Sequence, residues 1–323
     1  MYKTQNFRIV DPSSFPSKMY SEEEVLITEG APTMKRTIAD WDLDSHIEQT
    51  WSELVNELTA KGKGIPQSRP KLGLNQYVSN GNGKLELVIG VTSFREFHGT
   101  NIQASKDPDY REKLVQRGIE RFNDPYAFFS SMFGLNSAVE TADGKIVFGL
   151  RGEKTFHYPN CWHVIAGSAD IPKDGKVDFF GEMRKEVYEE LLVKEGEIDS
   201  VKVMGLVRSL QTYHPVISFH TKLGITYDEI ERRMKGEGVE EHNIIGAVNI
   251  DNLPAFLRNN QDGFSFPQYT TRGSRELDSL RLKSPPKGST NFFVPDGEAT
   301  LALYLAHQGF DIERELPYVS RDN

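Results

Sequence analysis

Apolar residues recur at helical spacing near the beginning of the chain, after an irregular, polar segment that extends to Asp42. A helix is predicted from Asp44 to Ala60, because its apolar positions lie three and four residues apart: Ile47, Trp51, Leu54, Val55 and Leu58. Gly62 and Gly64 follow, and glycine commonly ends a helix. The first regular element is therefore expected to be an amphipathic helix.

Two strand-like runs come next, from Leu72 to Val78 and from Leu85 to Val91. The turn-forming residues Asn80 to Gly83 between them predict a hairpin. Further on, Asp107-Pro108 combines a helix cap with a first-turn proline, which predicts another helix. Asp124-Pro125 predicts the start of a second, short helix.

A new succession of strands begins near Met132, and we place a domain boundary there. Residues 1–131 are expected to form an amino-terminal α+β extension, and residues 132–323 a second domain. Its predicted strands cover residues 134–141, 145–151, 201–207, 216–221 and 244–250, and its helices cover 181–193, a segment from Thr226, and 296–307. Mixed strands with helices on both sides predict an α/β sandwich.

Composition and charge narrow the class of protein. The 323 residues are 37% hydrophobic and 26% charged, which is typical of a globular protein of about two domains. The net charge of -9 argues against nucleic-acid binding, which needs clustered Lys and Arg. Cys161 is the only cysteine, so no intrachain disulfide can form, and a cytoplasmic location is the default expectation. Neither a signal peptide nor a membrane-spanning run is predicted.

The segment from Gly181 to Val193 carries the candidate chemistry. On a helix Glu182, Glu186 and Glu190 are four residues apart, and Glu189 lies three residues after Glu186. All four carboxylates are therefore expected on one face, with no Lys or Arg there to offset their charge. An apolar stripe beside them is expected to enter the core: Met183, Val187 and Leu191.

Two interpretations of this acidic face remain open. Most such faces are solvated surfaces of amphipathic helices. Against that, like charges four residues apart destabilise a helix by about 0.2–0.5 kcal/mol per pair. A divalent cation would offset the repulsion, and carboxylates are the ligands that Mg²⁺ prefers. Such an ion can activate water and neutralise phosphoryl oxygens.

The acidic helix resembles the second half of the Nudix box, G-x5-E-x7-R-E-U-x-E-E-x-G-U, where U is apolar. The match is Lys185 to Val193, with Lys185 in place of the arginine and Leu192 in place of the late glycine. Upstream, Trp162 to Ser168 resembles the strand and turn that carry the first box glycine, here Gly167. The interval between Gly167 and Lys185 is longer than in the usual pattern.

A second element narrows the resemblance. Gly90 to Asn101 is similar to the Gly-x-Thr-Ser-Tyr-Arg-Asp-Phe-x-Gly-Thr-Asn element of the Nudix subfamily that hydrolyses UDP-glucose and UDP-galactose. That subfamily also has an amino-terminal domain and a stretched box. Similar segments follow at Gly134 to Ala138, Val147 to Arg151 and Glu240 to His242, so the resemblance extends from about Leu85 to Leu305.

The resemblance implies a Nudix-type α/β/α sandwich with a mixed sheet, and hydrolysis of a nucleoside diphosphate sugar to UMP and a sugar 1-phosphate. It implies Mg²⁺, or Mn²⁺, held by Glu186, Glu189 and Glu190 with the carbonyl of Gly167. Glu240 or Glu241 could add a metal ligand or orient water. Lys185 stands where the box arginine holds a glutamate, but lysine lacks the two-pronged geometry of arginine.

Further polar residues are candidates for contact with the substrate. Arg151 ends a strand beside the expected metal site and could meet a phosphate. Arg95 and Asn101 could contact substrate or, together with Ser93 and Thr100, fix a loop between the domains. Cys161 is expected to be a packing residue. The histidines lack the spacing of a zinc site: His157, His163, His214, His220 and His242. Stacking on a nucleobase is an alternative to core packing for Phe156, Tyr158, Trp162 and Tyr213.

Three functions stay open at this point. The first is a UDP-sugar pyrophosphatase. The second is a Nudix hydrolase for another nucleoside diphosphate, such as ADP-ribose, NADH or a dinucleotide polyphosphate. The third is a binding module without catalysis, which the changes at Lys185 and Leu192 make conceivable. Retention of all three box glutamates favours an enzyme, because a binding module has no need for clustered carboxylates.

Overall fold

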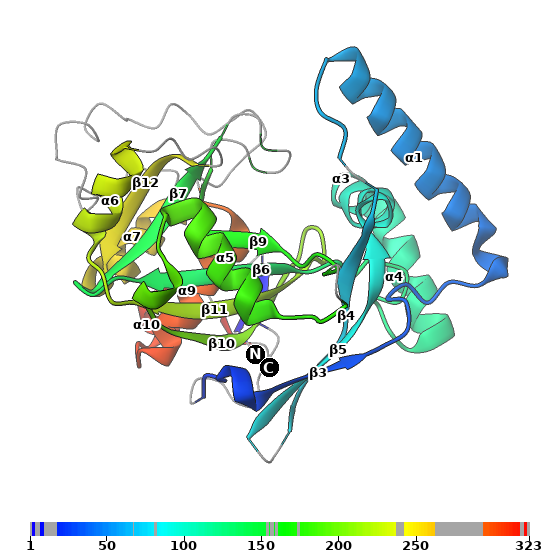
Figure 1. Ribbon diagram of the computed structural model, residues 1–323. Helices are drawn as coiled ribbons and strands as arrows, with labels where there is room; N and C mark the ends of the chain where they lie inside the picture. Colours follow the sequence, from blue (N-terminus) through cyan, green and yellow to red (C-terminus); the bar gives the residue numbers. More distant parts are fainter. Residues whose placement is uncertain are drawn as a thin grey trace.

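The computed structural model describes residues 2–3, 7–9, 18–66, 68–80, 83–152, 155, 158, 161–172, 175–236, 242–261, 293–316 and 320–321. These residues form a three-stranded sheet with its own helices beside a much larger mixed sheet (Figure 1). The candidate Glu240 and Glu241 lie outside the described residues, as do Phe156 and His157, so their predicted roles stay predictions.

The small sheet has the order β3-β5-β4. Strands β4 (Pro70–Asn80) and β5 (Lys84–Ser93) form the predicted hairpin, and α1 (Trp41–Ala60) is the predicted first helix. Strand β3 (Val25–Glu29), in contrast, lies in a segment predicted to be irregular. It pairs in parallel with β5, and this partner some sixty residues away is what makes it a strand.

A nearly continuous helical run follows β5. It comprises α2 (Phe94–Phe97), a π-helical turn (His98–Ile102), α3 (Gln103–Lys106) and α4 (Pro108–Phe122). Asp107 caps α4 as predicted, accepting from the backbone amides of Asp109 and Tyr110. The second short helix predicted at Asp124 is wrong, because its carboxylate accepts from the amide of Tyr126 and stabilises a turn instead.

The large sheet has the order β12-β7-β6-β11-β10-β2-β1-β13, with β8 beside β7 and β9 beside β6. Strands β6 and β11 pair in parallel, whereas their other neighbours are antiparallel. Strands β1 and β2 come from the start of the chain, so residues assigned to the amino-terminal extension also extend this sheet. The strand bounds are β1 (Tyr2–Lys3), β2 (Phe7–Ile9), β6 (Gly134–Glu140), β7 (Lys145–Arg151), β8 (Trp162–His163), β9 (Ile165–Ser168), β10 (Ile198–Ser209), β11 (Pro215–Leu223), β12 (His242–Asn249) and β13 (Ser320–Arg321).

Helices cover both faces of the large sheet (Figure 1). On β7, Val147 belongs to the core formed with α5 (Phe179–Leu191) and α6 (Tyr227–Gly236). Its neighbour Phe148 points to the other face and packs with the core of α7 and α9. This alternation of adjacent residues confirms the predicted α/β sandwich with a mixed sheet. The helices of the second face are α7 (Leu253–Gln261), α9 (Pro295–His307) and α10 (Ile312–Glu315).

Helix α9 is buried along most of its length, with Ala299, Leu301 and Leu305 fully enclosed. It is a core helix of 13 residues. Among the described residues, none of the helices combines the length and apolar character required to cross a bilayer.

Candidate functional site

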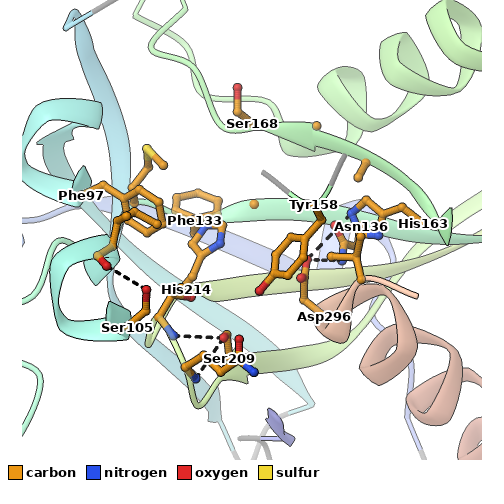
Figure 2. A pocket seen from close by; sticks show the side chains of 18 of the residues that line it. Phe97, Ser105, Phe133, Asn136, Tyr158, His163, Ser168, Ser209, His214 and Asp296 are labelled. Atoms are coloured by element: carbon orange, nitrogen blue, oxygen red, sulfur yellow. Dashed lines mark hydrogen bonds and ion pairs between the residues drawn. The ribbon is translucent and has the colours of Figure 1, made fainter. Parts of the chain in front are cut away.

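A cavity of about 560 Å³ lies where the amino-terminal helical run meets the large sheet. Phe97, Ile102 and Lys106 contribute one wall, and β6, β9 and the first turn of α9 contribute another. Figure 2 shows these walls facing each other, with Phe97 and Ser105 opposite the group around Asp296. The amino-terminal region is therefore part of the site.

The acidic helix α5 forms next to this cavity for local reasons. Asp178 caps it by accepting from the amide of Gly181 at 2.8 Å. The predicted apolar stripe is confirmed, because Met183, Val187 and Leu191 are fully buried. The helix ends at Leu192, whose backbone is left-handed with φ 57°. The position that the Nudix box gives to glycine thus has the conformation that glycine favours.

The helical spacing predicted that the four carboxylates of α5 share one exposed face. This prediction is wrong. Glu186 lines the cavity and lies against Gly167 of β9, where an added Cβ would overlap its carboxylate. Glu190 is 2% exposed and accepts from the amide of Ala166 at 3.4 Å. Glu189 points outward, with 53% of its side chain exposed. Glu190 therefore lies on the buried side of the helix, and Glu189 lies on its solvent-exposed side.

Lys185 also corrects the expectation that no cation offsets these charges. Its Nζ lies 3.5 Å from Glu182 and 3.9 Å from Glu189. Partial burial opposes the charged form of Lys185, but the nearby carboxylates of Glu182 and Glu189 raise its pKa overall. The ammonium group therefore lies closest to the outer carboxylates of the helix, and its charge also acts on Glu186.

The oxygen atoms beside the cavity suit a hard divalent cation in their chemistry. Glu186 and Glu190 both reach β9, Glu186 beside the Cα of Gly167 and Glu190 at the backbone amide of Ala166, the residue before it. The absence of a side chain at Gly167 is what lets Glu186 approach. Within the described part of the chain, no three His, Cys, Asp or Glu side chains converge closely enough to hold a metal. The outward position of Glu189 is one reason.

Arg151, Arg95 and Asn101 separate into two groups. Arg151 is half-buried and lines the cavity, as a phosphate-binding residue would. Arg95 instead pairs with Glu48 of α1 at 2.9 Å and does not line the cavity. Asn101 is fully buried, and its amide donates to the carbonyl of Thr212 at 2.7 Å. It connects the helical run to the loop between β10 and β11, which matches the structural alternative for this element.

The histidine and aromatic candidates also have distinct environments. His163 and Tyr158 line the cavity, and Tyr158 has a left-handed backbone with φ 50°. His220 pairs with Glu140 at 2.9 Å, away from the cavity wall. Trp162 is 1% exposed and belongs to the core. Cys161 is fully buried, in agreement with a packing role.

Sequence reasoning missed the polar group at the start of α9. The carboxylate of Asp296 accepts from the amide nitrogen of Asn136 at 3.0 Å, and His163 Nε2 lies 3.9 Å away. The sequence placed Asp296 only at the start of a predicted helix, and Asn136 only within a predicted strand. No local signal links two residues that are 160 positions apart.

The charge state of this group follows from its surroundings. Burial alone would raise the pKa of Asp296, but His163, His214 and the amide of Asn136 lower it below the ordinary value. Burial lowers the pKa of His214 to about 4, so at neutral pH this ring is uncharged while Asp296 is ionised.

Known proteins with similar sequences are the uridine diphosphate glucose pyrophosphatases NUDT22 of Mus musculus and Bos taurus. Each is 22% identical over 184 residues, which is 52% of this chain and 58% and 62% of the respective relatives. The human protein of the same name is 21% identical over 184 residues. This chain thus spans about three fifths of the curated relatives that it matches. No family model matches the chain.

Solved structures give weaker likenesses. The MutT protein of Methanosarcina mazei Go1 is 16% identical, covers 47% of this chain and 96% of its own, and has a TM-score of 0.29. A bifunctional NMN adenylyltransferase/ADP ribose pyrophosphatase of Francisella tularensis covers 64% of this chain and 47% of its own, at 8% identity and a TM-score of 0.31.

In sequence the chain is thus similar to UDP-glucose pyrophosphatases, as the Gly90 to Asn101 element predicted. Its mixed α/β sandwich is the fold that the resemblance to Nudix hydrolases predicted.

Proposed function

We propose that this chain is a divalent-metal-dependent Nudix hydrolase that cleaves a nucleoside diphosphate sugar of the UDP-glucose or UDP-galactose type. Water would attack the diphosphate bridge and yield UMP and a sugar 1-phosphate. The observation that carries the proposal is the approach of Glu186 to Gly167 inside a cavity that also contains Arg151. Similarity to UDP-glucose pyrophosphatases supports the choice of substrate class.

The residues of the chain suggest a division of labour along the cavity. Glu186, with Glu190 and the carbonyl of Gly167, would hold Mg²⁺ or Mn²⁺ at one end. When bound, such an ion supplies charge neutralisation at phosphoryl oxygens and activation of water. Arg151 offers a guanidinium group to the diphosphate. Lys185, held near Glu182 and Glu189, would limit repulsion on the outer side of α5.

The test is a substrate panel assayed for monophosphate release, with Mg²⁺ and with chelator. UDP-glucose, UDP-galactose, ADP-ribose, ADP-glucose and NADH should be compared by kcat/KM at one metal concentration. We expect metal-dependent cleavage and preference for the UDP-sugars. Glu186→Gln should abolish turnover, whereas Glu182→Gln, on the same helix but paired with Lys185, should retain most of it.

Two outcomes would contradict the proposal in different ways. A tenfold or larger preference for an adenine substrate, about 1.4 kcal/mol in transition-state binding, would favour the ADP-ribose or NADH alternative. Absence of turnover across the panel, with nucleotide binding retained, would favour a binding module.

A further inference from the structure

The carboxylate of Asp296 is nearly enclosed, yet it forms part of the cavity wall. Its side chain keeps 16% of its surface exposed, and Figure 2 shows it beside Asn136, His163 and Tyr158. An acid in the first turn of a helix is favoured by the helix dipole wherever it points. The dipole therefore accounts for an acid at this position, but it does not require the side chain to line a cavity.

The hydrogen-bonding capacity of this carboxylate exceeds what its neighbours use. An ionised carboxylate has about four acceptor positions. The amide of Asn136 donates to one of them and the backbone N–H of Asp296 itself interacts with another, whereas His163 Nε2, at 3.9 Å, is too distant for a hydrogen bond. Acceptor positions therefore remain toward the cavity. Since a partly satisfied buried carboxylate is costly, donors from a bound molecule would complete its shell.

The position of this group relative to the acidic helix indicates which part of a substrate it would meet. Asn136 on β6 pairs with Ala166 on β9, one residue before Gly167. Asp296 belongs to α9, which packs on the opposite face of the sheet from α5 and Glu186. A molecule that filled the cavity would thus reach Glu186 with one end and Asp296 with another.

We propose that Asp296, positioned by Asn136, binds a pair of neighbouring hydroxyl groups on a ring sugar of the substrate. This inference rests on the proposed function and adds the residue that orients the non-reacting end. A negatively charged acceptor attracts hydroxyl donors and repels phosphoryl oxygens, which are themselves acceptors. The same group therefore directs the diphosphate away from α9 and toward Arg151 and the metal ion that Glu186 would hold.

Hydroxyl pairs of this kind occur in both the ribose and the hexose of a UDP-sugar, so the test uses two analogues. One is UDP-glucose that lacks the ribose 2′-hydroxyl, and the other lacks the glucose 3-hydroxyl, which belongs to both neighbouring hydroxyl pairs of the hexose. Removal of the hydroxyl that meets Asp296 should raise KM about tenfold in the wild-type protein, with kcat nearly unchanged. The analogue that shows this loss identifies the sugar.

Asp296→Ala should bind the complete substrate more weakly and should no longer distinguish it from that analogue. Asp296→Asn keeps the size of the side chain, retains one acceptor oxygen and should show reduced discrimination even if the alanine variant folds poorly. Asp251→Ala, at an exposed position away from the cavity, is the matched control and should discriminate as the wild type does.

Binding of the same three compounds, measured by calorimetry, separates this inference from the proposed function. Suppose that the wild type binds UDP-glucose more tightly than one analogue, that Asp296→Ala does not, and that the wild type shows no turnover. This result supports the hydroxyl site and contradicts the hydrolase. Turnover with equal discrimination by wild type and Asp296→Ala contradicts the hydroxyl site alone. If none of the compounds binds to the wild-type protein, both proposals are wrong.

Discussion

Gly167→Ala tests the central contact of the candidate site with a single methyl group. An added Cβ at this position would overlap the Cγ, Cδ and Oε1 atoms of Glu186. The glutamate side chain must therefore rotate away from β9, because the backbone of a paired strand has less freedom to move. Displacing a catalytic group by about 1 Å can reduce the rate about 100-fold, which is about 2.7 kcal/mol in the barrier.

The effect of this substitution on stability should be much smaller than its effect on rate. Overpacking costs about 1–3 kcal/mol in a closed core, and Gly167 lies at a cavity into which the carboxylate can move. We expect a loss near the lower value, which corresponds to a fall in Tm of about 2–4 °C. Gly196→Ala is the matched control, since nothing lies within 4 Å of a Cβ at that position.

The assay compares monophosphate release from UDP-glucose with thermal unfolding, each for wild type, Gly167→Ala and Gly196→Ala. If Gly167→Ala keeps activity within about threefold of the control, the Glu186 contact has no catalytic role and the reasoning fails. A large loss of Tm together with activity would instead show that the contact is structural.

Four further results are expected. Glu189→Gln should keep most of the turnover and leave stability within about 0.5 kcal/mol, because this carboxylate is half-exposed and points away from the cavity; loss of turnover in a stable variant would assign Glu189 to the metal site, as the Nudix resemblance implies. Millimolar Mg²⁺ should raise the Tm of the wild type, and Glu186→Gln should weaken this effect; no shift even with substrate present would contradict a metal site. Leu192→Gly should leave stability in urea denaturation unchanged or raise it by up to about 1 kcal/mol, because glycine adopts the left-handed backbone of this position (φ 57°) without strain. Leu192→Ala keeps the strained backbone and should lower stability. Burial alone would raise the pKa of Asp143, but Lys145 and the backbone amide of Tyr227 lower it from 3.8 to about 2. The ionised carboxylate therefore stabilises the folded protein fully above pH 3.8, and this contribution is lost as the pH falls through about 2. Urea titrations of Asp143→Asn should show a loss of up to about 2 kcal/mol at neutral pH and a flatter decline between about pH 4 and pH 2, and a decline as steep as that of the wild type would refute this assignment.

The sequence by itself determined the elements whose signals are local. Helical periodicity and capping residues placed α1, α4 and α5 to within a few residues, and turn residues placed the β4–β5 hairpin. These signals suffice because a helix or a hairpin is stabilised by neighbours within a few positions along the chain. The sequence also indicated Glu186 and Gly167 as partners, although only through resemblance to a family pattern.

Tertiary structure decided what depends on distant partners. Strand β3 exists because β5 pairs with it, and the difference between buried Glu190 and exposed Glu189 depends on which side of α5 meets β9. The approach of Asp296 to Asn136 requires the whole sheet to bring α9 against β6. Periodicity assigns a residue to a helix face, but burial and charge at that residue depend on the surface that packs against it. For this reason the acidic helix was recognisable in the sequence, whereas the cavity that gives it a role became visible only in the folded chain.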